Sequence, residues 1–222
     1  LFTFINMSLT KLQQSTRSQF TNFKNEIMIH AADIGRVSPE NLAILVDTWF
    51  KKDKKLVINQ LDKDPNLQLQ YVSHEVDKIN ENVNNENEEQ MDEITFLLRL
   101  HIQLLCALQK YDEVLPALKK NPLYPIDEVL SLCKVNQVTD AAIYLYQIKG
   151  APDEGLKLAV SILDKSFVEI TAKLNDPNFN NENQFSILLD AFSKSILQCI
   201  QICEKNDQRY EELWFTLLDK LY

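Results

Sequence analysis

Apolar side chains recur at intervals of three and four residues along most of this chain, a pattern typical of amphipathic helices. The pattern is clear behind Ser38-Pro39, which supplies a serine cap and a proline at the first helical position. The apolar stripe that follows consists of Leu42, Leu45, Val46 and Trp49. No segment alternates convincingly between apolar and polar residues, so the sequence predicts an all-α fold.

The same periodicity predicts about ten helices of unequal length. They are expected to begin near Pro39, Leu56, Leu67, Met91, Asp112, Asp127, Thr139, Asp153, Phe185 and Tyr210. The longer ones should span residues 91–110, 153–174 and 185–203, and Gly150 stands where a left-handed helix cap belongs. Because short connections favour antiparallel neighbours, we expect an α-solenoid of stacked antiparallel helical hairpins.

Three Asp-Glu pairs open apolar runs, at residues 112–113, 127–128 and 153–154. Acidic residues in a first turn complement the partial positive charge of a helix N-terminus, and Pro125 and Pro152 precede two of the pairs. Paired carboxylates also serve in glycoside hydrolysis, but helix stabilisation explains these pairs more simply. Their uneven spacing excludes a strict repeat such as a tetratricopeptide array.

Two polar stretches interrupt the helical pattern and suggest how the chain is organised. Residues 80–90 contain one apolar side chain and residues 175–184 are rich in asparagine, so both are predicted to be flexible loops. Residues 38–222 are predicted to form the solenoid and residues 1–37 a helical flank of uncertain order. The chain begins Leu-Phe-Thr without a signal peptide, and we expect it to be a fragment of a longer protein.

The net charge of −9 argues against nucleic-acid binding and against a polybasic membrane anchor. Lys51-Lys52-Asp53-Lys54-Lys55 is a local exception. We interpret it as a solvated helix end or connection, with a contact for acidic lipid or protein as the alternative. The three glycines of the chain form no phosphate-binding loop and leave few sites for tight β-turns.

The four cysteines, Cys106, Cys133, Cys199 and Cys203, all lie in apolar runs and form no CxxC pair. Cys199 and Cys203 share a helix face, but no histidine lies near them in sequence. We therefore predict buried free thiols in a reducing compartment, and neither a disulfide framework nor a metal site.

The three histidines, His30, His74 and His101, are far apart in sequence. Lys78 stands where an HExxH motif after His74 would need its second histidine. His101 and Cys106 are about 140° apart on a helix, so they do not face each other as a nucleophile and its base. The sequence therefore predicts no catalytic residue, metal or cofactor, and the chain is not expected to be an enzyme.

Aromatic residues lie within the apolar helical runs, and core packing is the simplest interpretation of them. Trp214 is the exception that we keep open. If its ring were exposed, it would be a candidate anchor for a protein partner.

A series of short motifs resembles one known family when the motifs are taken in order. The motifs are Tyr111-Asp112-Glu113-Val114-Leu115, Tyr124-Pro125-Ile126-Asp127-Glu128, Leu132-Cys133, Val138-Thr139-Asp140-Ala141-Ala142, Tyr144-Leu145 and Gly150. They resemble the clathrin-heavy-chain-type repeat of the large vacuolar-protein-sorting tethers, and most closely the family of subunit eight, the specific subunit of the endosomal CORVET complex. Residues 61–71 and 211–219 resemble flanking segments of that family, so the similarity extends over residues 38–222. Ala-Pro-Asp at residues 151–153 departs from the family pattern, and the asparagine-rich loops match nothing in it.

The resemblance implies a function as well as a fold. Members of this family carry a β-propeller, an α-solenoid and a RING domain, and they tether endosomes through a Rab GTPase. This chain resembles the solenoid alone, which implies a non-catalytic scaffold that binds other tethering subunits, with Rab binding by other regions of the parent protein. It also implies a cytoplasmic protein that associates peripherally and indirectly with endosomal or vacuolar membranes.

Other interpretations remain open at this point. The solenoid of the HOPS counterpart subunit and that of clathrin heavy chain share the repeat. An all-α enzyme with a concealed acid–base site between helices is a more distant alternative, which a converging pocket of buried histidines and carboxylates would favour.

Overall fold

The computed structural model describes residues 1–14, 17–81, 88–175, 182–206 and 211–221. Within these ranges the secondary structure consists of thirteen α-helices and one 3-10 helix, without a strand, and the predicted all-α class is confirmed. The chain divides into two compact units, Leu1–Pro125 and Ile126–Tyr222. We call them the first and the second unit.

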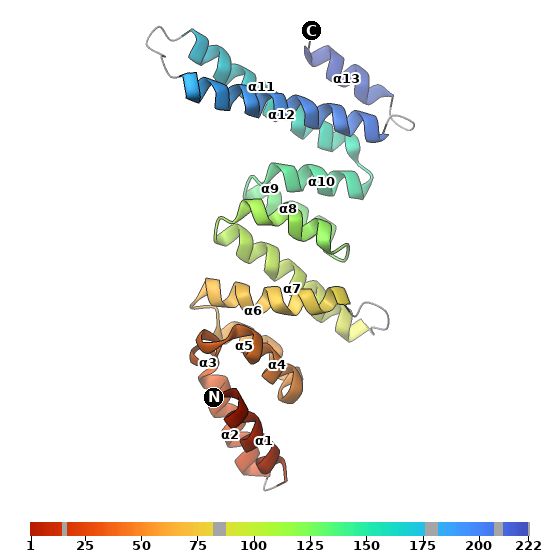
Figure 1. The fold of residues 1–222 in the computed structure, drawn as a ribbon. Helices are drawn as coiled ribbons and strands as arrows, with labels where there is room; N and C mark the ends of the chain where they lie inside the picture. Colours follow the sequence, from red (N-terminus) through yellow and green to blue (C-terminus); the bar gives the residue numbers. More distant parts are fainter. Residues whose placement is uncertain (15–16, 82–87, 176–181, 207–210, 222) are drawn as a thin grey trace. The chain divides into compact units, whose positions relative to one another are not determined.

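The first unit contains eight of the α-helices and the 3-10 helix, and helices that follow one another in sequence mostly pack together (Figure 1). In order they are α1 (Phe2–Gln13), α2 (Arg17–Ile29), α3 (Ala31–Val37), α4 (Pro39–Trp49), η1 (Lys51–Asp53), α5 (Lys54–Gln60), α6 (Pro65–Glu81), α7 (Glu88–Ala107) and α8 (Tyr111–Lys120). Helix α6 packs against α3, α4, α5 and α7, so it is central to the unit.

The second unit contains five helices: α9 (Ile126–Val135), α10 (Thr139–Lys149), α11 (Pro152–Leu174), α12 (Glu182–Asn206) and α13 (Glu212–Leu221). Helix α10 packs against α9 and α11, and α11 lies along α12 (Figure 1). One apolar core, built around Leu156, Leu163, Cys199 and Leu217, joins α10, α11, α12 and α13.

Several helix ends lie where the sequence predicts them. The Ser38 hydroxyl accepts a hydrogen bond of 3.2 Å from the backbone N–H of Asn41, and Pro39 begins α4. Gly150 has the left-handed backbone of a C-terminal cap (φ 77°), and Pro152 begins α11. All three Asp-Glu pairs lie in the first turn of their helices. These local expectations are confirmed because each depends on only a few neighbouring residues.

The number of helices and the bounds of one of them differ from the prediction. The ten α-helices from α4 onward are preceded by three more in residues 1–37, which the sequence marked only as a helical flank. Helix α7 runs from Glu88 to Ala107 and not over residues 91–110, because Gln109 adopts a left-handed backbone (φ 58°) that ends it.

Residues at the edges of the two predicted loops are helical. Helix α6 continues to Glu81 and α7 begins at Glu88, so residues 80–81 and 88–90 are helical. Helix α12 begins at Glu182, three residues earlier than predicted, which makes residues 182–184 helical as well. The hydrogen bonds of a helix are made within the backbone, so a lack of apolar side chains does not fix where a helix stops. The rest of the predicted loops, residues 82–87 and 176–181, lies outside the described residues.

Gln109 belongs to a joint between helices that occurs three times. Gln109, Gln137 and Gly150 all have positive φ, and each lies three residues before an aspartate in the first turn of the next helix. The same pair of backbone hydrogen bonds closes each joint, as in Gln137 N–H to Lys134 C=O and Val138 N–H to Cys133 C=O. This is the Schellman motif, here followed directly by a new helix.

Candidate functional site

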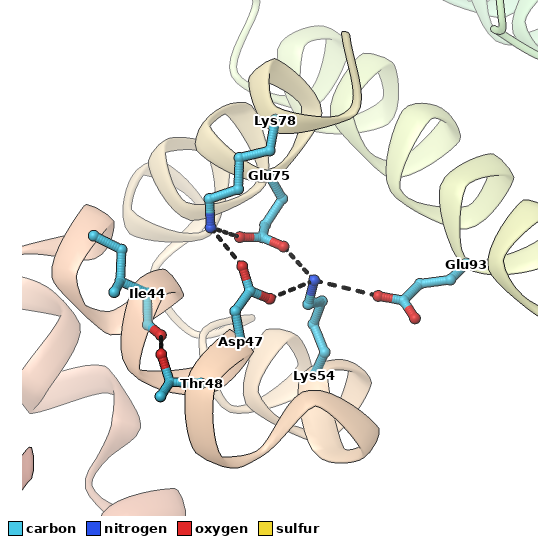
Figure 2. A network of polar contacts seen from close by, with 7 residues as sticks. All are labelled: Ile44, Asp47, Thr48, Lys54, Glu75, Lys78 and Glu93. Carbon is cyan, nitrogen blue, oxygen red and sulfur yellow. Dashed lines mark hydrogen bonds and ion pairs between the residues drawn. The ribbon is translucent and has the colours of Figure 1, made fainter. Parts of the chain in front are cut away.

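Five charged side chains converge inside the first unit in a network of ion pairs. Asp47 comes from α4, Lys54 from α5, Glu75 and Lys78 from α6, and Glu93 from α7 (Figure 2). We call this group the ion-pair cluster. The cluster forms because each of these four helices places a charged residue on the face that it packs against its neighbours. On α5, for example, Lys54 shares one stripe with the buried residues Val57, Ile58 and Leu61.

Lys54 and Lys78 each bridge several carboxylates. The Lys54 Nζ forms an ion pair with Glu75 Oε2 and lies 2.8 Å from Asp47 Oδ1 and 3.3 Å from Glu93 Oε1. The Lys78 Nζ lies 2.6 Å from Asp47 Oδ2 and 2.8 Å from Glu75 Oε1. The side chains of Lys54 and Glu75 are 10% and 2% exposed, so their pairing is shielded from solvent.

The pKa values follow from these contacts. Burial alone would lower the pKa of Lys54, but the charge of Glu75 and the hydrogen bond to Asp47 outweigh it and raise that pKa. Burial alone would raise the pKa of Asp47, but hydrogen bonds from Lys54 and Lys78 outweigh it and lower that pKa. Asp47 and Lys54 are therefore both charged at neutral pH. A general base has to offer a lone pair to a substrate. The carboxylates of this cluster instead bond to Lys54 and Lys78, and these bonds link four helices.

Tyr71 packs against this cluster from the core. Its side chain is fully buried, and its hydroxyl has no hydrogen-bond partner among the described residues. Burial raises the pKa of Tyr71, and the charges of Glu75, Asp47 and Glu93 raise it further. The phenol therefore stays neutral at physiological pH.

His101 forms a second buried polar group. Its Nδ1 lies 2.8 Å from the Tyr124 hydroxyl and its Nε2 lies 3.2 Å from Ser73 Oγ, so it links α6, α7 and the segment after α8. Burial lowers the pKa of His101 to about 4. The ring is neutral at pH 7, with one nitrogen donating a hydrogen bond and the other accepting one. His101 is therefore a hydrogen-bonded helix residue, and it is buried.

The four cysteines are all buried, as predicted, and none of them lies in a disulfide. Burial raises the pKa of Cys106, so its thiol stays protonated at neutral pH, and the ring nitrogens of His101 bond to Tyr124 and Ser73. In the described part of the chain, no three His, Cys, Asp or Glu side chains are grouped as metal ligands.

The basic stretch at residues 51–55 was interpreted wrongly at one position. Lys51, Lys52 and Lys55 are exposed, as a solvated helix end would be, but Lys54 is buried in the ion-pair cluster. The sequence did contain the signal, because Lys54 continues the apolar stripe of α5 by one turn. Local charge density concealed this helical position.

The remaining candidate residues lie on the surface or at its edge. Each Asp-Glu pair has a lysine partner: Lys110 for Glu113 at 2.9 Å, Lys149 for Asp127 at 2.5 Å and Lys157 for Glu154 at 2.8 Å. Trp214 is half-buried and packs against the core of the second unit, whereas the neighbouring Phe215 is exposed.

Comparisons with family models, with curated proteins and with solved structures find no match for this chain.

Proposed function

We propose that this chain is a non-catalytic scaffold segment of an endosomal vesicle-tethering subunit of the CORVET type. Its role would be to hold other tethering subunits at defined positions along a solenoid of stacked helical hairpins. The chain would act in endosomal and vacuolar protein transport, in the cytoplasm, with indirect peripheral attachment to the membrane. Rab binding would be carried out by other regions of the parent protein.

The observation that supports this proposal most is the succession of α9, α10 and α11. These helices pack one after another, and they contain most of the ordered motifs that resemble the tethering family. Consecutive packing of helices is the arrangement from which a solenoid is built. The polar side chains of the ion-pair cluster bond to one another across four helices, which favours a structural role for that cluster over a catalytic one.

Binding to purified complexes tests the proposal. The chain would be immobilised and incubated separately with recombinant CORVET lacking its subunit eight, with HOPS lacking the counterpart subunit, and with clathrin light chain. Selective retention of CORVET subunits is expected. Retention of HOPS subunits or of clathrin light chain would instead assign the chain to those scaffolds, and retention of none would refute the assignment.

Small-angle X-ray scattering tests the architecture separately. A solenoid of 222 residues gives an elongated particle whose radius of gyration clearly exceeds that of a globule, which is about 17 Å for this length. A compact particle would contradict the solenoid even if a tethering subunit were retained.

A further inference from the structure

Helices α11 and α12 pack against each other through a seven-residue repeat. The rings of Phe167 and Phe192 lie 6.2 Å apart, which fixes the register of the antiparallel pair. Residues that are buried or half-buried along the seam recur at intervals of three and four. They are Leu156, Ala159, Leu163, Ser166, Ile170 and Lys173 on α11, and Phe185, Leu188, Phe192, Ser195, Cys199 and Ile202 on α12. This spacing is that of a two-stranded antiparallel coiled coil.

One side of this helix pair is apolar over its full length. The positions that flank the seam on this side are Val160, Phe167 and Leu174 on α11, and Leu189, Ile196 and Cys203 on α12. We call these six residues the apolar flank. The equivalent positions on the opposite side are Gly155, Ile162, Glu169, Gln184, Ala191 and Gln198, which are mostly small or polar.

Helix α13 covers only one end of the apolar flank. Leu213 and Leu217 of α13 share a buried core with Val160 and Cys203, and Ile196 packs against it. At the other end, Phe167 is 58% exposed, Leu174 65% and Leu189 42%. The flank therefore continues past the helix that covers it.

We propose that the open end of the apolar flank binds an amphipathic α-helix of another protein chain, packed in line with α13. Apolar residues of the flank recur every seven residues at both its covered end and its open end. Seven residues correspond to about 10.5 Å along a helix, so the open end lies further along α11 and α12 by steps of that length. A helix with large apolar side chains four residues apart, as Leu213 and Leu217 are, therefore matches both ends. The docking surface follows from packing alone, whichever complex contains the chain, and thus goes beyond the proposed function.

Charge favours a protein helix over two other occupants. The positions bordering the open end are Asp164, Thr171, Ser186 and Ser193, which include no basic residue for lipid phosphate. By length and composition residues 183–206 of α12 could cross a membrane, but they include Asp190, Lys194, Glu204 and Lys205, and α12 packs against α11 and α13. Two copies of a chain with net charge −9 repel each other, which disfavours a second copy as the occupant and favours a helix of another chain.

A peptide with the sequence of α13 tests the docking surface. A fluorescein-labelled peptide of residues 211–221, stapled on its polar face to keep it helical, would be titrated with the full chain by fluorescence anisotropy. We expect saturable binding that weakens at least tenfold in Phe167→Ser and in Leu174→Ser. Val168→Ser is the matched control, because Val168 is 66% exposed and lies outside the apolar flank, and it should bind like the unmodified chain. Circular dichroism establishes that the variants fold, and Leu174→Ser removes a more exposed side chain than Phe167→Ser does.

Other results would overturn the proposal. These are no binding of the peptide, equal binding to all three variants, or a loss confined to a Val160→Ser variant, which would mean that the peptide had only displaced α13. A dimer in sedimentation that Leu174→Ser abolishes would assign the surface to a second copy. Flotation with phosphatidylcholine–phosphatidylserine vesicles, also abolished by Leu174→Ser, would assign it to a membrane.

Discussion

Lys54 and Glu75 form a buried ion pair that joins α5 to α6 inside the first unit, and each side chain also contacts a second charged group. Neither partner can lose its counter-charge without a cost. An isolated charge in a protein interior is far less stable than one in water. The pair therefore disfavours any packing of α5 and α6 that would separate Lys54 from Glu75.

Replacing Lys54 with Met should destabilise the first unit by about 3 kcal/mol, because Glu75 keeps its buried charge and loses one of its two lysine partners. The double variant Lys54→Met with Glu75→Leu should recover most of this loss. Lys52→Met, in the same basic stretch but exposed, should change the free energy of unfolding by less than about 0.5 kcal/mol. Urea unfolding followed by circular dichroism measures all three. Equal effects of the Lys52 and Lys54 replacements would contradict a structural role for the cluster.

His101 should make stability fall as the pH is lowered from about 6.5 towards 4. Its folded pKa of about 4 lies below the unfolded value of 6.5, so the unfolded chain takes up the proton first. The contribution is fully present above pH 6.5 and amounts to about 3 kcal/mol, lost progressively as the pH falls through that range. Urea unfolding at pH 7.5 and pH 5 checks this. His101→Gln, which cannot be protonated, should show a shallower dependence, and an unchanged slope would exclude His101 as its source.

The three helix joints predict opposite effects of glycine and alanine. Gln109 and Gln137 adopt positive φ, which costs a residue with a Cβ about 1 kcal/mol. Gln109→Gly and Gln137→Gly should therefore each raise the free energy of unfolding. The gain is reduced by the greater conformational entropy that glycine gives the unfolded chain. Gly150→Ala should destabilise it by about 1 kcal/mol. Differential scanning calorimetry gives the signs, and a lower melting temperature for both glycine variants would contradict this account.

The four cysteines should resist alkylation in the native state. All are buried, and burial together with the neighbouring Cys203 raises the pKa of Cys199 to about 11, so little thiolate forms at pH 8. Ellman's reagent should titrate none of the four thiols rapidly in buffer and all four in 6 M guanidinium, a common reference condition for full unfolding. Rapid reaction of one thiol in buffer would reveal local opening around that residue.

Sequence reasoning succeeded where a feature depends on a few adjacent residues. Ser38 and Pro39 specify the start of α4 through a side-chain acceptor and a fixed φ, and Gly150 specifies an end through its freedom to adopt positive φ. The Asp-Glu pairs marked three helix starts. The structure shows that the repeated joint involves a different set of aspartates, Asp112, Asp140 and Asp153, because the joint is defined by backbone hydrogen bonds that glutamine and glycine both permit.

The candidate site was harder to foresee. Lys54 belongs to a run of lysines that predicts a solvated surface, and its burial depends on carboxylates from three other helices, Asp47, Glu75 and Glu93. The apolar stripe of α5 places Lys54 on the inward face of the helix, but no local pattern encodes which carboxylates it meets there. The apolar flank was missed for the same reason, since its six residues become one surface only when α11 and α12 pack in a particular register.

The sequence by itself determined that the chain is helical, where many of its helices begin and end, and which positions form the apolar stripe of each helix. These properties follow from periodicity, from capping side chains and from backbone freedom, all of which act within a few residues. Only the tertiary structure decided which charges neutralise one another and which side chains bond to the ring nitrogens of His101. It also decided which part of the apolar flank α13 leaves open. Such contacts join residues that are distant in sequence, and their energies depend on burial, which exists only once the helices have packed.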